Sequence, residues 1–367
     1  MSRPRKIAFL LPHFRAGGAE RVVLNWIGAL DRTRFQPMLF LTRIEGAFLD
    51  LLAADVRPIA LGAARAIRLP RHIARALADH DIAVAYSATN AMNIALLAAR
   101  AGQARRIVSE HTPPLAYLAE ARLPWLRRAA MRHYYPRADA VAVPTARIGK
   151  ELGSLIGKPL DLETLPNPVV SAVAEIGPRR TGNAIPQLVS AGRLVAAKGF
   201  DTLIDACARL AASDSPFRLT IHGEGALRES LEQRIVAAGL TGLVTLAGQT
   251  DGLERALAGA DLFVLASRRE GFGNVIIEAM AAGVPVLATR SGGPETFVRD
   301  RENGFLVAPD DPAALATTIA RLIDDRVGRD SVRNAAAETA RGFGIDASTR
   351  RFEALIDRLA PARSMAA

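Results

Sequence analysis

Cysteine is nearly absent from this chain of 367 residues, and aromatic residues make up only 5% of it. The single cysteine, Cys207, excludes an internal disulfide and a cysteine-rich metal site. Apolar runs stay well below the ~20 residues that cross a bilayer. The run at residues 7–11 is interrupted by Pro12 before a secretory signal can form. We therefore expect a cytoplasmic protein, soluble or attached peripherally to the inner face of the cell membrane.

Negative charge is scarce in the first half only. Residues 1–170 contain 24 Lys and Arg against 13 Asp and Glu (+11), whereas residues 171–367 contain 23 against 24 (−1). An arginine-rich composition explains the preference for Arg over Lys, but it does not explain this asymmetry. We expect the first half to meet an anionic partner. A nucleic acid fits poorly, because the basic residues are dispersed, without interleaved aromatic platforms or a known binding motif.

Short apolar runs alternate with amphipathic stretches along both halves, which predicts parallel sheets with helical crossovers. Strands are expected at residues 6–11, 36–42, 56–61, 82–87, 106–110, 140–144, 187–192, 217–223, 243–248, 261–266, 285–289 and 304–307. Helices are expected from about residues 19, 46, 67, 90, 124, 145, 200, 225, 252, 274, 312, 328 and 347. The α/β pattern predicts two doubly wound, Rossmann-like domains facing a cleft, at residues 1–170 and 187–342. A Pro- and Gly-rich linker at 171–186 separates them, and a helix with a tail follows at 343–367.

Two carboxylates with seven residues between them, Glu270 and Glu278, bracket a glycine turn between a predicted strand and a predicted helix. Glu270 falls at a strand's carboxyl end, where open α/β sheets bind ligands and helix N-termini favour anions. Arg193 and Lys198 lie on another such loop, with the spacing of a diphosphate clamp. Two solvated loop charges would be the alternative for an isolated pair. We favour function because both loops leave one predicted sheet at its carboxyl edge.

Weaker signals occur at other strand ends. Gly17 and Gly18 open the first long helix and allow close approach of the backbone to an anion, although a plain turn is equally consistent with them. Gly223 ends another predicted strand and is a candidate wall of a nucleotide site. His111 ends a strand of the first half, which makes substrate contact about as plausible as a structural role. A dinucleotide fingerprint G-x-G-x-x-G is absent, so a hydride-transfer enzyme lacks its usual support.

Two other segments each have a functional and a structural interpretation. Residues 123–137 read as a basic amphipathic helix, with Leu123 and Leu126 on one stripe and Trp125 and Tyr135 on the opposite, outward face. Such a face suits an anionic membrane, although an ordinary solvated face is the alternative. Residues 79–81 (Asp-His-Asp) resemble a metal-holding D-x-D sequence, but they fall at the wrong sheet edge and are interpreted as a polar turn. No metal is expected.

Taken together, these segments resemble the retaining glycosyltransferases of family 4 (glycosyl transferases group 1), which have the GT-B architecture. The resemblance is strongest from residue 188 to 307, and its most specific element is the segment from Glu270 to Glu278. It implies that Arg193 and Lys198 contact the donor diphosphate, Glu270 the transferred sugar and Glu278 the ribose. The residues whose backbone it implies for the anion site are Gly271, Phe272, Gly273, Asn274 and Val275.

The resemblance also implies that Gly17, Gly18 and His111 approach the sugar and diphosphate, and that the last helix crosses back to the first domain. The implied reaction is metal-independent, retaining transfer of a sugar from a nucleotide diphosphate sugar, with UDP-hexose or UDP-N-acetylhexosamine as a guess. The acceptor would be a glycan or a lipid-linked sugar in polysaccharide or lipopolysaccharide assembly. A nucleotide-sugar epimerase on the same fold and a nucleic-acid-binding protein remain the alternatives.

Overall fold

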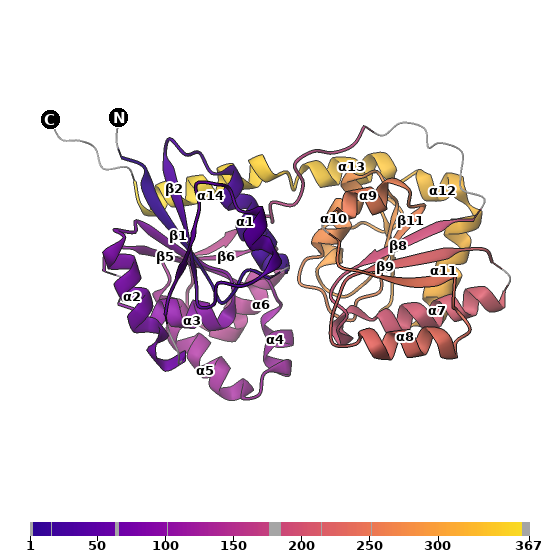
Figure 1. Ribbon diagram of the computed structural model, residues 1–367, viewed down its shortest axis with the longest axis horizontal. Helices are drawn as coiled ribbons and strands as arrows, with labels where there is room; N and C mark the ends of the chain where they lie inside the picture. Colours follow the sequence, from indigo (N-terminus) through magenta and orange to yellow (C-terminus); the bar gives the residue numbers. More distant parts are fainter. Residues whose placement is uncertain are drawn as a thin grey trace. The chain divides into compact units, whose positions relative to one another are not determined.

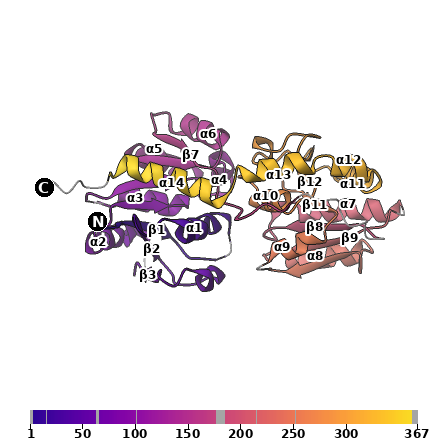
Figure 2. The same cartoon turned by 90° about the horizontal axis from the view of Figure 1, so that it is seen from above.

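The structure is a computed structural model that describes residues 3–15, 17–62, 66–100, 102–175, 185–213, 215–250 and 252–361. The chain divides into two compact units. Unit 1 consists of Met1–Val169 together with Ile345–Ala367, and unit 2 consists of Val170–Gly344. In each unit a parallel sheet lies between helices (Figures 1 and 2). The predicted linker at 171–186 has neither helix nor strand in its described residues, and its middle part, 176–184, lies outside the description.

Unit 1 contains a sheet of seven strands in the order β3-β2-β1-β4-β5-β6-β7, and all its pairs are parallel. The strands are β1 Arg5–Leu11, β2 Phe35–Leu41, β3 Pro58–Ala60, β4 Val84–Ser87, β5 Arg105–Ser109, β6 Ala140–Val143 and β7 Leu162–Thr164. The order reverses between β1 and β4. Ligands of doubly wound folds bind beyond the carboxyl ends of the strands at this point of reversal.

Alternating side chains of each central strand enter two separate cores. The helices of unit 1 are α1 Gly18–Ala29, α2 Leu69–Asp79, α3 Asn90–Ala98, α4 Pro114–Glu120, α5 Pro124–Tyr134, α6 Ala146–Ile156 and α14 Ile345–Leu359. In β1, Phe9 points to the face covered by α1 and α14, whereas Leu10 points to the face covered by α2, α3 and α6. Short 3-10 turns are η1 Ala47–Leu51, η2 Ala66–Arg68 and η3 Tyr135–Arg137.

The last helix, α14, belongs to the core of unit 1 although it is the end of the chain. Phe352 stacks on Trp26 of α1 at 4.5 Å between ring centroids and meets the ring of Tyr86 at 5.5 Å. Arg34 forms an ion pair with Glu353 at 2.9 Å. The predicted return of the last helix to the first domain is thereby confirmed, and Figure 1 shows α14 in yellow beside α1.

Unit 2 repeats the same topology with six parallel strands in the order β10-β9-β8-β11-β12-β13. The strands are β8 Gln187–Ala191, β9 Arg218–His222, β10 Val244–Gly248, β11 Leu262–Leu265, β12 Val286–Thr289 and β13 Phe305–Val307. The helices are α7 Phe200–Ala212, α8 Arg228–Ala237, α9 Leu253–Ala258, α10 Asn274–Ala281, α11 Pro312–Asp324, α12 Arg326–Asp330 and α13 Arg333–Arg341, with 3-10 turns η4 Ala196–Lys198 and η5 Pro294–Thr296. Here the order reverses between β8 and β11.

Several elements differ from the sequence-based expectation. The strand β7 and the helix α4 are not foreseen, because β7 is three partly exposed residues and α4 is a short helix that begins at the second of two adjacent prolines, Pro114. The helix expected from residue 46 is the short turn η1, and the one expected from residue 328 is two helices, α12 and α13. In the described part of the chain, no helix is both long and apolar enough to cross a bilayer.

The expected faces of residues 123–137 are only partly correct. Trp125, expected on the outward face, is 68% exposed. Tyr135, expected to point outward, is fully buried, whereas Leu123 and Leu126, expected to pack inward, are 51% and 48% exposed. The sequence keeps a helical spacing up to residue 137, but α5 ends at Tyr134. From Tyr135 the chain follows the tighter turn η3, and the ring of Tyr135 therefore lies in the core. The side chain of α5 that is buried is Met131.

Candidate functional site

The loop that follows β8 is held against the ends of two neighbouring strands. Gly192 donates its N–H to the carbonyl of His222 at the end of β9, and Leu194 donates to the carbonyl of Glu224. Gly199 has a φ of +62°, and a Cβ there would lie 2.1 Å from the carbonyl oxygen of Ala266, just past β11. Glycine is required by both the backbone angle and the close approach. Residues 192–199, hereafter the basic loop, are therefore fixed at the carboxyl edge of the sheet.

Lys198 and Glu270 form an ion pair between the basic loop and the loop after β11. The ammonium Nζ donates to Oε2 of the carboxylate, which also accepts from Ser267 Oγ at 3.3 Å. The side chains are 19% and 12% exposed, so both charges are mostly shielded yet reachable from solvent. The pair lies at the reversal of strand order, where ligands of doubly wound folds bind. Arg193 is exposed, and the described residues give its guanidinium no hydrogen-bond partner.

The end of β9 touches the basic loop so closely that only glycine fits. Gly223 has a φ of +148°, and a Cβ there would lie 1.9 Å from the carbonyl oxygen of Gly192. A Cβ at Gly225 would lie 2.4 Å from the carbonyl oxygen of Leu194. The predicted wall at Gly223 is thus a backbone-to-backbone contact that shapes the basic loop.

Residues 270–275 form a tight turn into α10. The N–H of Glu270 donates to the carbonyl of Ser291, and the carbonyl of Glu270 accepts from Gly293, so the turn is fastened to the loop after β12. Gly273 adopts a left-handed φ of +96° at the N-cap of α10. Phe272 is buried beside Phe297 and Phe343, with ring centroids 5.1 and 5.2 Å away.

The first turn of α10 therefore presents its N–H groups beyond the carboxyl end of β11. Gly271, Asn274 and Val275 are partly exposed there. Glu278 lies one turn further along α10 and is half-buried. A partly exposed helix start close to the Lys198 ammonium is an arrangement that favours an anion.

Arg268 holds the basic loop from the opposite side. Its guanidinium donates to both carboxylate oxygens of Asp201 at 2.7 and 2.8 Å and to Asp310 at 2.5 Å. The hydrogen bonds from Arg268 lower the pKa of Asp201 and keep it ionised. The N–H of Arg268 also donates to the carbonyl of Ala197. The sequence does not predict this network, although Arg268 lies between a predicted strand and Glu270.

The Gly17 loop of unit 1 follows β1, beside the other reversal point. Gly17 is the N-cap of α1 in an extended conformation with a φ of −154°, and Gly18 begins the helix. A Cβ at Gly17 would lie 2.3 Å from Oε2 of Glu20, whose carboxylate lies 3.7 Å from Nδ1 of His13. A carboxylate of the chain itself thus already lies at this helix start, which suits a sugar hydroxyl better than a second anion.

His111 lies just past β5, next to two hydroxyl groups. Its Nε2 is 2.9 Å from Ser109 Oγ and 3.3 Å from the hydroxyl of the buried Tyr86. Burial lowers the pKa of His111 to about 4, against a weaker opposing hydrogen bond with Asn167. The ring is therefore neutral near pH 7, and its chemistry there is hydrogen bonding rather than provision of a positive charge.

A buried carboxylate stands next to His111 and was missed from the sequence. Glu110 accepts hydrogen bonds from Asn90 at 3.1 Å, from Asn93 at 3.2 Å and from the hydroxyl of Tyr135. Burial raises the pKa of Glu110, and these three donors oppose the rise. The cluster ties β5 to α3 and to the end of α5, and so fixes the start of the His111 loop.

In the described ranges, no group of three or more His, Cys, Asp or Glu side chains is arranged to hold a metal ion. Residues 79–81 end α2 and turn with a φ of +52° at Asp81, which confirms the polar-turn interpretation. Cys207 is buried in α7, and burial raises the pKa of its thiol to about 12.

The comparisons with known proteins cover both units. The family Glycosyltransferase Family 4 matches residues 16–172, and the family Glycosyl transferases group 1 matches residues 181–342. A GDP-mannose-dependent alpha-(1-6)-phosphatidylinositol monomannoside mannosyltransferase of Mycobacterium tuberculosis is 32% identical over 69% of this chain and 69% of its own length. The chain belongs to glycosyltransferase family 4.

Two further similarities refine this assignment. The lipopolysaccharide core biosynthesis glycosyltransferase LpsE of Rhizobium meliloti is 38% identical over 47% of this chain, and the match spans about half, 49%, of LpsE. The structure of Alr3699/HepE of Anabaena in complex with UDP-glucose has a TM-score of 0.81 at 20% identity and covers 96% of this chain and 99% of that chain. The second similarity shows the GT-B fold alone. The predicted family, fold class and enzyme class are thus confirmed.

In this glycosyltransferase the predicted site residues fall into two groups, one in each unit. The carboxyl edge of the sheet in unit 2 carries Arg193, Lys198, Gly223, Glu270, Gly271, Phe272, Gly273, Asn274, Val275 and Glu278. The carboxyl edge of the sheet in unit 1 carries Gly17, Gly18 and His111. Sequence reasoning missed Ser267, Arg268 and Glu110, although each adjoins a strand end that it had singled out.

Proposed function

We propose that this family 4 enzyme transfers a sugar, with retention of anomeric configuration, from a nucleotide diphosphate sugar to a glycan or lipid-linked acceptor. The observation that supports the proposal best is the ion pair of Lys198 with Glu270. In this pair the residue that we assign to the diphosphate lies beside the residue that we assign to the sugar. Two loops of one sheet edge supply these charges, and glycine contacts fix the basic loop.

The donor diphosphate binds to Arg193, Lys198 and the N–H groups at the start of α10. Negative charge builds on the leaving phosphate as the bond between it and the sugar C1 breaks. Fixed cations and helix-start N–H groups stabilise that charge without a metal. Asp201 and Asp310 hold Arg268 and thereby the backbone of the basic loop.

Glu270 binds hydroxyl groups of the transferred sugar, and Glu278 binds the ribose. Two carboxylates near a glycosidic bond also suggest a double displacement through an enzyme nucleophile. Glu270 suits that role poorly, because Lys198 and Ser267 already donate to its Oε2 and lower its nucleophilicity. Glu278 is assigned to the ribose.

The reaction is then a substitution on one face of the sugar. The C1–O bond to the diphosphate breaks, the acceptor hydroxyl oxygen bonds to C1 on the same face, and its proton passes to the leaving phosphate oxygen. Neutral His111 donates or accepts a hydrogen bond at the sugar, and Gly17 and Gly18 let the sugar approach the backbone. No step needs a charged histidine.

The donor is a UDP-hexose or UDP-N-acetylhexosamine in this proposal. The structural neighbour from Anabaena holds UDP-glucose, whereas the mycobacterial relative is named as GDP-mannose-dependent. The pattern of relatives supports a role in the assembly of cell-surface polysaccharide or lipopolysaccharide, since LpsE is named for lipopolysaccharide core biosynthesis.

The enzyme works at the anionic inner face of the cell membrane in this proposal. Trp125 is 68% exposed at the start of α5, next to the exposed Leu123 and Leu126 and the exposed Arg122 and Arg128. Exposed apolar side chains among arginines fit the boundary between lipid head groups and acyl chains. The excess positive charge of residues 1–170 adds long-range attraction.

A thermal-shift screen of nucleoside diphosphates and their sugars, followed by transfer assays, tests the function. A ligand that binds only the folded state raises the melting temperature. We expect one nucleotide sugar to do so and to support transfer to a glycan or lipid-linked acceptor. Near-normal transfer by both Glu270→Ala and Lys198→Ala would refute the assigned roles.

A further inference from the structure

The loop after β12 is bonded to both backbone groups of Glu270. Residues 291–297 are hereafter called the β12 loop. The N–H of Glu270 donates to the carbonyl of Ser291 at 3.0 Å, and the carbonyl of Glu270 accepts from the N–H of Gly293 at 2.8 Å. The position of the Glu270 backbone therefore depends on the conformation of the β12 loop.

The β12 loop also packs tightly against the turn that follows Glu270. A Cβ at Gly293 would lie 2.6 Å from the N, Cα and O atoms of Phe272. The ring centroids of Phe272 and Phe297 are 5.1 Å apart. Because closely packed segments have little room for independent movement, a shift of the β12 loop would displace residues 270–272 as well.

Glu295 holds the β12 loop from within. Its Oε2 accepts a hydrogen bond at 2.7 Å from the N–H of Gly292, three residues earlier in the chain. Gly292 has a φ of +113°, which residues with a side chain rarely adopt. A bond from a backbone N–H to a carboxylate is charge-assisted and roughly twice as strong as a bond between neutral groups. Glu295 thus stabilises Gly292 in the arrangement in which its two neighbours, Ser291 and Gly293, reach Glu270.

We propose that Glu295 is a positioning residue for Glu270. Glu295 stabilises the β12 loop, and the β12 loop fixes the backbone of Glu270. Lys198 and Ser267 hold the carboxylate at the other end of the same residue. The inference deepens the proposed function and rests on it, because the position of Glu270 affects transfer only where Glu270 binds the sugar. A displacement of about 1 Å at such a group lowers the rate by up to about 100-fold.

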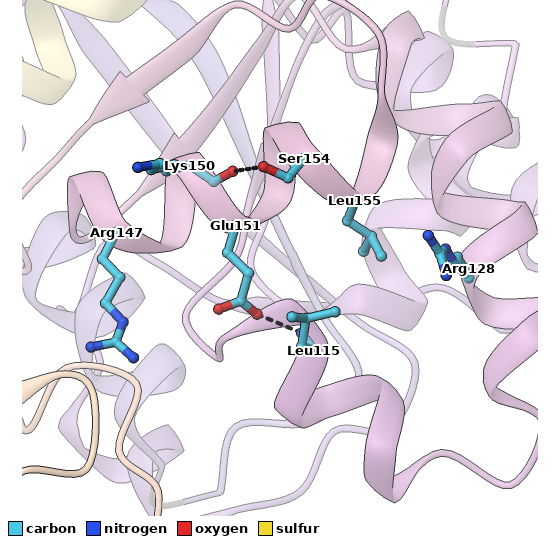
Figure 3. A pocket seen from close by; sticks show the side chains of 7 residues that line it. All are labelled: Leu115, Arg128, Arg147, Lys150, Glu151, Ser154 and Leu155. Atoms are coloured by element: carbon cyan, nitrogen blue, oxygen red, sulfur yellow. Dashed lines mark hydrogen bonds between the residues drawn. The ribbon is translucent and has the colours of Figure 1, made fainter.

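An equivalent bond in unit 1 supplies a matched control. Glu151 of α6 accepts a hydrogen bond at 2.6 Å from the N–H of Leu115 in α4 (Figure 3). Glu151 and Glu295 are both partly buried carboxylates that hold a backbone N–H, but Glu151 joins two helices of unit 1. Glu151→Ala and Glu295→Ala therefore remove the same kind of bond, and only Glu295→Ala should affect Glu270.

Amide hydrogen exchange tests the positioning without any substrate. Mass spectrometry follows the peptides that cover residues 268–276 and 290–297 in each variant. We expect Glu295→Ala to speed exchange in both peptides about tenfold, because the bonds between the β12 loop and Glu270 open more often. Glu151→Ala should leave these peptides unchanged.

Two conservative variants separate the length of the side chain from its charge. Glu295→Gln keeps an acceptor oxygen at the same distance from the N–H of Gly292, so its exchange should stay within about threefold of the wild type. Glu295→Asp keeps the charge but is one methylene shorter, so exchange should be faster, as in Glu295→Ala. The contrast between these two variants remains informative where Glu295→Ala does not fold.

Transfer and binding assays test whether the positioning reaches the reaction. Glu295→Ala should lower kcat about 10–100-fold, with circular dichroism like that of Glu151→Ala. It should weaken binding of the nucleotide sugar about tenfold and leave the nucleoside diphosphate within about threefold, since only the former carries the sugar. In the Glu270→Ala background, Glu295→Ala should lower kcat no further than about twofold, because both changes act through one group.

Three results would overturn the inference: equal exchange in Glu295→Gln and Glu295→Asp, equal kcat in Glu295→Ala and Glu151→Ala, or independent losses in the double variant. Failure of the proposed function has a different signature. Near-normal transfer by Glu270→Ala, or no nucleotide sugar bound by the wild type, would refute that function even if the exchange difference between Glu295→Ala and Glu151→Ala persisted.

Discussion

Lys198 and Glu270 lie 72 residues apart in the chain, and an ion pair joins them at the point where the strand order of the second sheet reverses. Each comes from a loop at a strand's carboxyl end, Lys198 after β8 and Glu270 after β11. Ser267 donates a further hydrogen bond to Glu270 at 3.3 Å. The contact links the two motifs that the sequence places on separate loops.

Lys198→Ala should lower kcat by about 10²–10³ while leaving the fold intact, because it removes a cation that stabilises charge on the leaving diphosphate. The matched control is Arg209→Ala, which deletes an exposed cation of α7. Steady-state kinetics and circular dichroism of both variants check this. Equal kcat values for Lys198→Ala and Arg209→Ala would contradict the role of Lys198.

Gly223→Ala should destabilise unit 2 by about 1–3 kcal/mol and weaken donor binding. The added methyl would lie 1.9 Å from the carbonyl oxygen of Gly192, in a backbone conformation that alanine disfavours. Gly239→Ala is the matched control, since its φ is +67° and nothing lies within 4 Å of the added Cβ. Urea unfolding and nucleotide titration separate the two effects. If both variants lost a similar free energy of unfolding, the loss would come from the positive φ angle and not from the close approach of the Cβ to the carbonyl oxygen of Gly192.

Glu110→Gln should change the pH dependence of stability. Burial raises the pKa of Glu110 above its ordinary value of 4.5, so the native state binds more protons than the unfolded state between the two pKa values. The free energy of unfolding of the wild type therefore falls as pH rises through that interval. Glutamine keeps an acceptor oxygen for Tyr135 but has no charge, so the free energy of unfolding of the variant should not fall in that interval.

Urea unfolding at about pH 4 and about pH 7.5 measures the Glu110 effect. Relative to the wild type, Glu110→Gln should be more stable at the higher pH than at the lower. Glu229→Gln, at an exposed position of α8, serves as control and should show a smaller change with pH. A pH-independent difference for Glu110→Gln would contradict ionisation of a buried carboxyl.

His111 should stay neutral down to about pH 4 because burial lowers its pKa to about 4. The native state then binds fewer protons than the unfolded state between the two pKa values, so this contribution to stability is full above about 6.5 and is lost as pH falls toward 4. NMR titration of the His111 ring, assigned with His111→Gln, checks this. A midpoint near 6.5 would contradict the neutral hydrogen-bonding role.

Trp125 should report membrane attachment by its fluorescence. It is 68% exposed, whereas the other tryptophan, Trp26, is buried at 1% exposure. Vesicles rich in phosphatidylglycerol should shift the emission to shorter wavelength, and phosphatidylcholine vesicles should not. Trp125→Phe should abolish the shift while Trp26 continues to emit. An unchanged spectrum of the wild type on anionic vesicles would refute attachment through α5.

Most of the architecture could be predicted because parallel strands and amphipathic helices carry strong local patterns. The start of α10 at Asn274 and of α11 at Pro312 follow from a preceding glycine turn and from a proline at the first helical position. Tyr135 was misplaced because helical spacing cannot show that η3 tightens the chain. Glu110 was missed because no local pattern marks a carboxylate whose partners Asn90 and Tyr135 are distant in sequence.

Calorimetric titration of nucleoside diphosphates tests the account most directly, since it needs no acceptor. The basic loop and the start of α10 should bind one nucleoside diphosphate with a stoichiometry of about one. Lys198→Ala should weaken that binding at least about tenfold, whereas Arg209→Ala should not. Absence of binding by every nucleoside diphosphate, or equal affinity of wild type and Lys198→Ala, would contradict the proposed donor site.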